Sequence, residues 1–156
     1  MDIAQLLAPE RILCEPDAVS KKRSLEILSE ILVKNEPEIP AQHVFESLLG
    51  REKLGSTGLG NGVALPHGRS DSFDQARLAV IKLARGIDYD APDSEPVDLL
   101  FALIVPEDST DDHLQILALL AEMLADKKFL TQIRQTNNCQ ALYQLLTHWE
   151  KTSNAA

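Results

Sequence analysis

The sequence predicts an α/β fold, in which helices cover a β-sheet. Two segments, Leu78 to Leu83 and Val97 to Val105, are short, apolar and partly β-branched, and Gly86, Pro96 or Pro106 lies at their borders, which is typical of strands. Several longer segments instead repeat apolar residues at helical spacing. Helices and strands mixed in this order along one chain predict an α/β arrangement.

The second strand is apolar at nearly every position, which favours a central strand covered on both faces. A smaller strand is expected within Gly62 to Pro66. The order of the strands in the sheet does not follow from these patterns.

The first strong helical pattern runs from Ser20 to Lys34, with the Ser20 side chain placed to cap the helix and Pro37 blocking its continuation. A second helix is expected from Ala41 to Lys53, ending where Gly55 opens a loop.

A third helix has the clearest signals in the chain. Ser109 and Thr110 offer caps, Asp111 and Asp112 suit a first turn, and leucines continue at helical spacing to Leu124. Two more helical stretches are expected at Lys127 to Gln135 and at Gln140 to Trp149.

Length and composition predict one globular domain. The chain has 156 residues, of which 44% are hydrophobic and 25% charged, and no repeat or Pro/Gly/Ser-rich linker divides it. We therefore expect a single domain over residues 1–152 and a disordered tail over residues 153–156.

The charge balance excludes some classes of partner. Asp and Glu number 24 against 15 Lys and Arg, a net charge of −9, so the surface repels nucleic acid and anionic lipid. The longest apolar run, Leu99 to Val105, is far shorter than the roughly 20 residues that cross a bilayer. No secretory signal is visible at the N-terminus, so we expect a cytoplasmic protein without membrane insertion.

Two cysteines, Cys14 and Cys139, lie far apart in the sequence and fit no CxxC metal or redox pattern. We expect both to be buried free thiols. The acidic residues likewise show no metal-ligand spacing.

The least ordinary feature is a glycine-rich run. Five of the seven glycines fall between Gly55 and Gly68. Glycine at this density brings backbone N–H groups close to a ligand, as in anion-binding loops, but it also serves ordinary tight turns. Neither G-x-x-x-x-G-K-[ST] nor a complete dinucleotide fingerprint is present, so a nucleotide site is not expected.

His67 lies near the end of this run, between Pro66 and Gly68. Proline fixes the backbone just before the imidazole, and glycine removes bulk just after it. An imidazole has an ordinary pKa near 6.5, so much of it is neutral and nucleophilic at neutral pH and can carry a covalent group. The residues alone leave two interpretations open, a nucleophile and a loop residue.

The stretch REKLGSTGLGNGVALPHG, from Arg51 to Gly68, closely resembles the signature of mannitol/fructose-type IIA domains of the bacterial phosphoenolpyruvate-dependent phosphotransferase system. The similarity extends from the first helix through the Pro96 to Leu103 segment to His113, and it is greatest to the free-standing nitrogen-regulatory branch of that family. The resemblance implies a single domain with a mixed central sheet flanked by helices.

It also implies a phosphohistidine at His67, formed by transfer from a phosphorylated HPr-like carrier without metal, nucleotide or other cofactor. His113 matches the second histidine of the family's site, where it would stabilise the phosphoryl group, and Arg51 matches an arginine that would contact the phosphoryl oxygens. The loop residues that could cradle the phosphoryl group are Gly55, Ser56, Thr57, Gly58, Gly60 and Asn61.

For the three polar loop side chains, we slightly favour the alternative that they stabilise turns. His43 and His148 match no functional position.

Three functions remain to be separated. The first is a regulatory phosphocarrier whose phosphorylation state selects its target proteins, with nitrogen, carbon and potassium regulation suggested by the family. The second is a sugar-specific IIA component that passes phosphoryl groups to a separate IIB protein. The third is an interaction module in which His67 is never modified.

Overall fold

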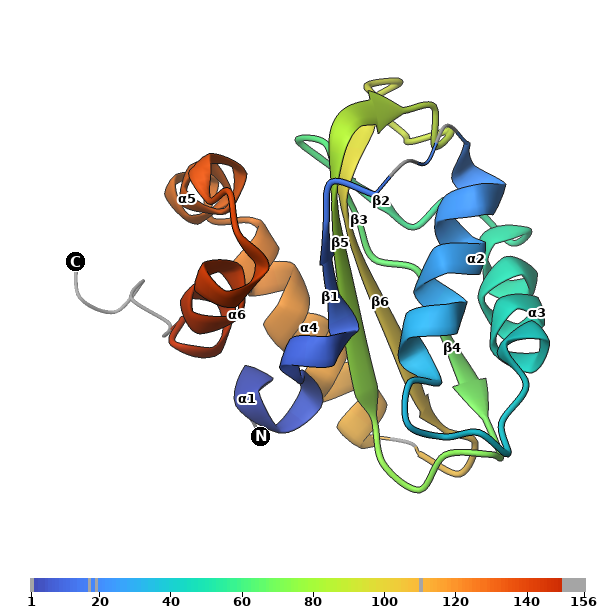
Figure 1. Ribbon diagram of the computed structural model, residues 1–156. Coiled ribbons are helices and arrows are strands. Elements are labelled where there is room, and N and C mark those ends of the chain that lie inside the picture. The colour runs from blue at the N-terminus through green and yellow to red at the C-terminus, as the bar shows by residue number, and fades with distance from the viewer. Residues whose placement is uncertain (1, 17, 19, 110, 150–156) are drawn as a thin grey trace.

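The computed structural model describes residues 2–16, 18, 20–109 and 111–149, and over these ranges a six-stranded sheet lies between two groups of helices (Figure 1). The elements in chain order are α1 Ile3–Leu6, the 3₁₀-helix η1 Pro9–Arg11, β1 Ile12–Cys14, α2 Lys21–Leu32, α3 Ala41–Glu52, β2 Gly58–Gly60, β3 Val63–Ala64, β4 His67–Ser70, β5 Arg77–Ile87, β6 Val97–Pro106, α4 Asp111–Leu124, α5 Lys127–Gln135 and α6 Cys139–Thr147.

The sheet is mixed, as the resemblance implies. Its strand order is β1-β5-β6-β3-β2, and β4 also pairs with β6. Strands β5 and β6 are antiparallel, whereas β1 is parallel to β5, and both β3 and β4 are parallel to β6. Strands β3 and β4 therefore follow one another along the same edge of β6, which takes the chain from the turn between β2 and β3 to His67.

Strand β6 is buried on both faces, which confirms the prediction of a central strand. Leu99, Phe101 and Leu103 join the core formed with α4, α5 and α6, whereas Leu100 and Ala102 join the core formed with α2 and α3. This alternation follows from the period of two in a strand. Figure 1 shows the two helix layers on opposite faces of the sheet.

The predicted helices are all present. Helices α2 and α3 lie within the expected ranges of Ser20 to Lys34 and Ala41 to Lys53. The hydroxyl of Ser20 accepts a hydrogen bond from the backbone N–H of Arg23 at 3.0 Å, which is the expected cap. Helix α4 begins at Asp111, and the proposed cap at Thr110 lies outside the described residues.

The strands differ from expectation in length and number. Strand β5 extends beyond Leu78 to Leu83, and its pairing with β6 becomes irregular between Lys82 and Ile87, where the apolar pattern is lost. The short strands β1, β2 and β4 were not expected. His67 is the first residue of β4, so it lies in a strand rather than at the end of a loop.

The two cysteines are free but only half-buried, which corrects the expectation of buried thiols. The reason is their position, since Cys14 ends the edge strand β1 and Cys139 begins α6. Burial nevertheless raises the pKa of Cys14 to about 12, and the neighbouring Cys139 thiol contributes to this increase.

All six strands of the described residues belong to one sheet. The tail expected at residues 153–156 lies outside the described residues. Within the described part of the chain, no helix has the length and apolarity needed to span a membrane.

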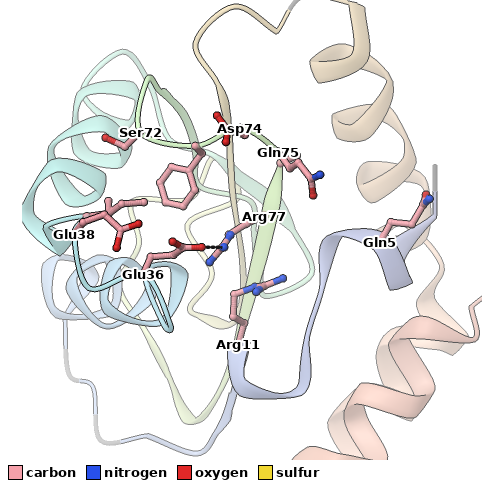
Figure 2. Close-up of a pocket in the computed structure, with 11 residues that line it drawn as sticks. Gln5, Arg11, Glu36, Glu38, Ser72, Asp74, Gln75 and Arg77 are labelled. Atoms are coloured by element: carbon pink, nitrogen blue, oxygen red, sulfur yellow. Dashed lines mark hydrogen bonds and ion pairs between the residues drawn. The ribbon is translucent and has the colours of Figure 1, made fainter.

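A pocket of about 440 Å³ lies where the N-terminal segment meets β5 (Figure 2). Its two arginines are held by protein groups. Arg11 donates to the carbonyls of Leu78 and Leu6, and Arg77 pairs with Glu36. Burial lowers the pKa of Arg11, and the adjacent Arg77 charge lowers it further. The arginines thus brace the N-terminal segment and the end of α2 against β5.

Candidate functional site

The direction of the His67 side chain follows from its register in the sheet. His67 pairs with Leu103 and Gly68 with Ile104. Side chains of paired residues lie on the same face of a sheet, and Leu103 belongs to the core on the α4 side. His67 therefore faces α4, and Gly68 faces α3.

Gly68 is required by packing rather than by access to the imidazole. A Cβ atom at this position would lie 3.2 Å from the carbonyl carbon and oxygen of Ser47 and would also meet its hydroxyl. That hydroxyl donates to the carbonyl of Arg69 at 2.8 Å. The missing side chain lets α3 approach β4 closely beside His67.

His113 lies in the first turn of α4 and is brought to His67 by the fold. The two rings have centroids 5.9 Å apart and planes inclined at 74°. His113 is 8% exposed, and neither of its buried ring nitrogens has a hydrogen-bond partner among the described residues. Buried polar atoms are almost always paired, so these two unpaired nitrogens make His113 a candidate for contact with a ligand at His67.

The His67 ring is fixed through one nitrogen. Nδ1 lies 2.8 Å from the carbonyl oxygen of Leu65. A carbonyl oxygen only accepts, so Nδ1 carries the proton and Nε2 keeps its lone pair. Burial lowers the pKa of His67, and the Arg51 charge lowers it further, against the opposing effects of this hydrogen bond and of Glu52. The ring is therefore neutral at neutral pH.

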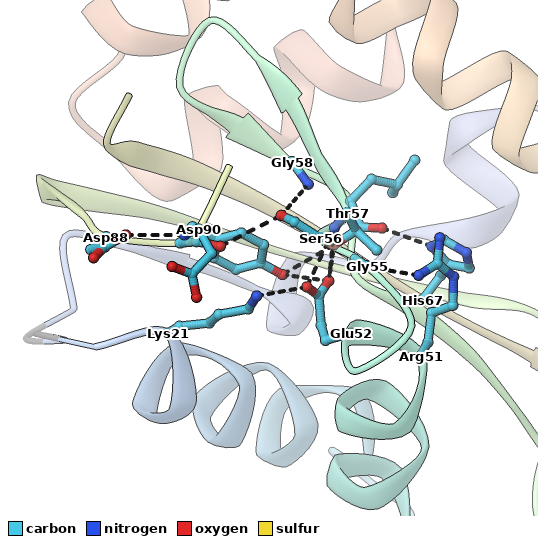
Figure 3. A network of polar contacts seen from close by, with 12 residues as sticks. Lys21, Arg51, Glu52, Gly55, Ser56, Thr57, Gly58, His67, Asp88 and Asp90 are labelled. Carbon is cyan, nitrogen blue, oxygen red and sulfur yellow. Dashed lines mark hydrogen bonds and ion pairs between the residues drawn. The ribbon is translucent and has the colours of Figure 1, made fainter. Parts of the chain in front are cut away.

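Arg51 lies in the last turn of α3, beside this ring. Its Nη1 donates to the carbonyl of Gly55 at 2.9 Å, which holds the guanidinium against the glycine-rich turn (Figure 3). The structure thus brings together all three residues, His67, His113 and Arg51, that the resemblance assigns to the site.

Arg69 is a further cation that the sequence interpretation missed. It lies two residues after His67 on β4, and its charge lowers the pKa of His113, whose burial is the larger cause. The signal for it was the period of two in a strand, which places residues 67 and 69 on one face. That signal could not be used while His67 was assigned to a loop.

The hydroxyl groups of the loop form hydrogen bonds within the chain. The Ser56 hydroxyl accepts from the N–H of Gly58 at 3.1 Å, and the Thr57 hydroxyl donates to the Glu52 carboxylate. Asn61 occupies the turn between β2 and β3 with a φ of 57°. These contacts agree with a role in turns, while contact with a phosphoryl group stays a prediction.

Different structural constraints explain the individual glycines of the run. Gly60 and Gly62 have φ values of 90° and 78°, which few other residues adopt, so they form the β2–β3 turn with Asn61. A Cβ on Gly58 would lie 2.9 Å from the Cβ of Ala91. Gly55 has a φ of 145° and supplies the carbonyl that Arg51 binds.

His43 and His148 are both exposed, on α3 and just after α6. Neither enters the site, in agreement with their lack of a matching position.

Comparison with known proteins defines the class. The family model described as "Phosphoenolpyruvate-dependent sugar phosphotransferase system, EIIA 2" matches residues 5–149. The chain belongs to this family, whose members transfer phosphoryl groups between proteins and so interact with other phosphocarrier proteins.

Within the family, similar proteins carry the name of the nitrogen-regulatory branch. The chain is 47% identical over 138 residues to the nitrogen regulatory protein of Escherichia coli (strain K12), covering 88% of this chain and 84% of that protein. The crystal structure of nitrogen regulatory protein IIA-Ntr from Neisseria meningitidis matches with a TM-score of 0.87 and 38% identity, over 93% of this chain and 99% of that one.

The fold extends to a sugar-specific relative. The crystal structure of IIA mannitol from Escherichia coli matches with a TM-score of 0.73 over 89% of this chain and 97% of that one, at 22% identity. At this identity the likeness shows the shared mannitol-type fold alone.

Proposed function

We propose that the protein is a regulatory phosphocarrier that accepts a phosphoryl group on Nε2 of His67 from a phosphorylated HPr-like protein. The observation that carries this proposal is the arrangement of His67 and His113, with a buried and unpartnered second imidazole 5.9 Å from the first.

The transfer step is a displacement at phosphorus. The Nε2 lone pair of His67 forms the new N–P bond, while the bond between phosphorus and the donor residue breaks and its electron pair stays on the donor. The proton remains on Nδ1, which donates it to the Leu65 carbonyl oxygen 2.8 Å away. No metal, nucleotide or other cofactor is needed, because the reaction asks chiefly for positioning and for charge stabilisation.

His113 would stabilise the transferred group. An N–H of its ring would donate to a phosphoryl oxygen, which would satisfy one of the two buried nitrogens. The negative charge of the phosphoryl group would also favour protonation of the ring, against the burial that lowers its pKa. A donor in this position would stabilise the negative charge that develops on the phosphoryl oxygens during the transfer, and so would lower the barrier.

Arg51 and Arg69 would supply positive charge on either side. Arg51 is anchored on Gly55, and Arg69 donates to the carbonyl of Glu107 at 3.4 Å. Planar guanidinium groups suit phosphoryl oxygens because they offer several N–H donors in a fixed geometry.

The surface around the site suits a protein partner. Among the described residues, the large exposed hydrophobic side chains include Leu54 (83% exposed), Leu59 (45%) and Leu114 (65%). Leu54 and Leu59 belong to the segment between α3 and β3, and Leu114 follows His113. Leu54 lies three residues after Arg51 and Leu114 directly follows His113, so both are close in sequence to proposed site residues and offer apolar contacts to a protein partner. We propose that the donor is the HPr-like carrier protein and that the transfer takes place in the cytoplasm.

The regulatory role is supported by the relatives named nitrogen regulatory proteins. Phosphorylation would add about two negative charges at His67 and change the surface that partners contact. Target proteins that distinguish the two forms would then respond to phosphorylation state.

The test is an intact-mass measurement after incubation with phosphoenolpyruvate, enzyme I and an HPr-type carrier. We expect the mass to increase by one phosphoryl group in the wild type and to stay unchanged in His67→Ala. An unmodified wild type would instead support a non-catalytic interaction module. Efficient onward transfer to a fructose- or mannitol-type IIB protein would support the sugar-specific alternative.

A further inference from the structure

A buried carboxylate lies behind the proposed phosphoryl site. Glu52, the last residue of α3, is only 6% exposed. It follows Arg51 in the sequence but lies away from His67, among residues of α2, the glycine-rich turn and the segment after β5 (Figure 3). A buried charge is costly unless it is paired and hydrogen-bonded, so its partners explain its position.

Four donors meet the Glu52 carboxylate. The backbone N–H of Thr57 lies 3.2 Å from Oε1 and 3.3 Å from Oε2, and the Thr57 hydroxyl also donates to Oε1. The Tyr89 hydroxyl donates to Oε1 at 3.0 Å, and Lys21 Nζ lies 2.8 Å from Oε2. The carboxylate therefore joins four segments of the chain at one point.

The protonation of these groups keeps the network intact. Burial raises the pKa of Tyr89 well above its usual value, and the Glu52 charge raises it further, so the phenol remains a donor. The Lys21 ammonium also lies 4.4 Å from the centroid of the Tyr89 ring. Lys21 thus forms an ion pair with Glu52 and also packs over the ring of Tyr89, which donates to the same carboxylate.

Two hydrogen bonds connect this network to His67. The carbonyl of Thr57 accepts from the N–H of Leu65 at 3.0 Å. The carbonyl of Leu65 in turn accepts from Nδ1 of His67 at 2.8 Å. Glu52 holds both the N–H and the hydroxyl of Thr57, so it fixes the residue to which Leu65 is bound.

A second connection passes through Arg51. The N–H of Gly55 donates to the carbonyl of Glu52 at 3.1 Å, and the carbonyl of Gly55 accepts from Arg51. The turn from Gly55 to Thr57 is therefore held at one end by the Glu52 backbone and at the other by its side chain.

We propose that Glu52 is a positioning residue for phosphoryl transfer: by holding Thr57, it fixes the Leu65 carbonyl that orients His67 with Nδ1 protonated and Nε2 facing the donor. This inference rests on the proposed function of His67. Glu52 touches no reacting atom and acts through Thr57 and Leu65.

The first test compares Glu52→Gln with the wild type. Glutamine keeps the size of the side chain but replaces one acceptor oxygen with an NH₂ group, so Lys21 or Thr57 loses its acceptor. Glu46→Gln is the matched control, because Glu46 is exposed on the same helix and the substitution removes the same charge. The measurements are transfer kinetics from a phosphorylated HPr-type carrier and the ¹⁵N NMR shifts of the His67 ring.

In Glu52→Gln we expect kcat to fall about tenfold or more, since small misplacements of a reacting group are costly, while KM for the carrier stays the same. We also expect the His67 shifts to move from the Nδ1–H tautomer toward a mixture. Glu46→Gln should match the wild type in both measurements.

A second pair of variants keeps the inference testable if Glu52→Gln does not fold. Thr57→Val removes the hydroxyl at nearly constant volume, and Thr57→Ser retains it. We expect Thr57→Val to show the same loss of kcat and the same change in tautomer, and Thr57→Ser to restore both. A merely structural role predicts that stability changes while kcat and tautomer do not.

Wild-type kcat and an unchanged His67 tautomer in both Glu52→Gln and Thr57→Val would overturn the inference. Failure of the proposed function is distinguishable, because it would appear as an unphosphorylated wild type. The NMR comparison would then still decide whether Glu52 orients the ring.

Discussion

The imidazole rings of His67 and His113 lie 5.9 Å apart between centroids and are inclined at 74°, although one belongs to strand β4 and the other to helix α4. The register of β4 on β6 turns His67 toward α4, and the first turn of α4 carries His113 to the same place. A phosphoryl group on Nε2 of His67 would give the unpartnered nitrogens of His113 an acceptor.

This relationship predicts that His113→Ala slows phosphoryl transfer to His67 without preventing folding. Loss of one donor from a site that stabilises developing charge lowers rates on the order of 100-fold. Transfer is measured by quenched-flow or by a phosphate-sensitive gel, with circular dichroism as the test of folding. His43→Ala is the control, because this imidazole is exposed on α3. Equal rates for His113→Ala and the wild type would exclude the assigned role.

Arg51→Lys tests the guanidinium. Lysine keeps the charge but cannot both bind the Gly55 carbonyl and present a planar pair of donors. Loss of one charge-assisted hydrogen bond corresponds to a decrease in transfer rate of about tenfold. The control is Arg23→Lys, which changes a half-exposed arginine on α2 that pairs with Glu26. A rate no different from that of Arg23→Lys would show that the charge alone is sufficient.

Stability should depend on pH through the two imidazoles. Burial lowers the pKa of His67 and of His113 below the ordinary 6.5. The unfolded chain therefore binds protons at a higher pH than the folded chain. The contribution to the free energy of unfolding is fully present above pH 6.5 and is lost as the pH falls through the lowered values.

The measurement is urea unfolding between about pH 7 and about pH 5. His113→Gln should lose less stability than the wild type over this range, because it lacks one of the two titrating rings. The expectation is wrong if the two proteins lose stability equally.

Gly68→Ala and Gly50→Ala should change stability in opposite directions. A methyl group at Gly68 would press on Ser47 of α3, whereas nothing lies within 4 Å of a Cβ on Gly50. We expect Gly68→Ala to lower the free energy of unfolding by about 1–3 kcal/mol, and Gly50→Ala, in the same helix as Ser47, to raise it by about 0.5–1 kcal/mol. Urea unfolding measures both. A stable Gly68→Ala protein with normal transfer would contradict the packing argument.

Strong periodic patterns made the main elements predictable. Helices α2, α3 and α4 bury long apolar stripes, and β6 is apolar on both faces, so local sequence determines them. The short strands β1 and β2 have three residues each, and β4 has the sequence HGRS, in which no apolar alternation exists. Strands β1 and β4 form by pairing with the more distant strands β5 and β6, which no local pattern records, whereas β2 pairs with the neighbouring β3.

Some residues of the proposed site could likewise be predicted from the sequence, and others could not. Chemistry alone made His67 a candidate nucleophile, and the resemblance added His113 and Arg51. Glu52 and Arg69 were missed for a physical reason. A carboxylate at a helix end and an arginine after a histidine are ordinary surface residues until the sheet register and the turn place them beside the site.

Phosphorylation of His67 can be measured from the mass of the intact protein after incubation with phosphoenolpyruvate, enzyme I and an HPr-type carrier. We expect one added phosphoryl group in the wild type, bound through an acid-labile bond, and none in His67→Ala. An unchanged mass in the wild type, or an acid-stable adduct that persists in His67→Ala, would contradict it.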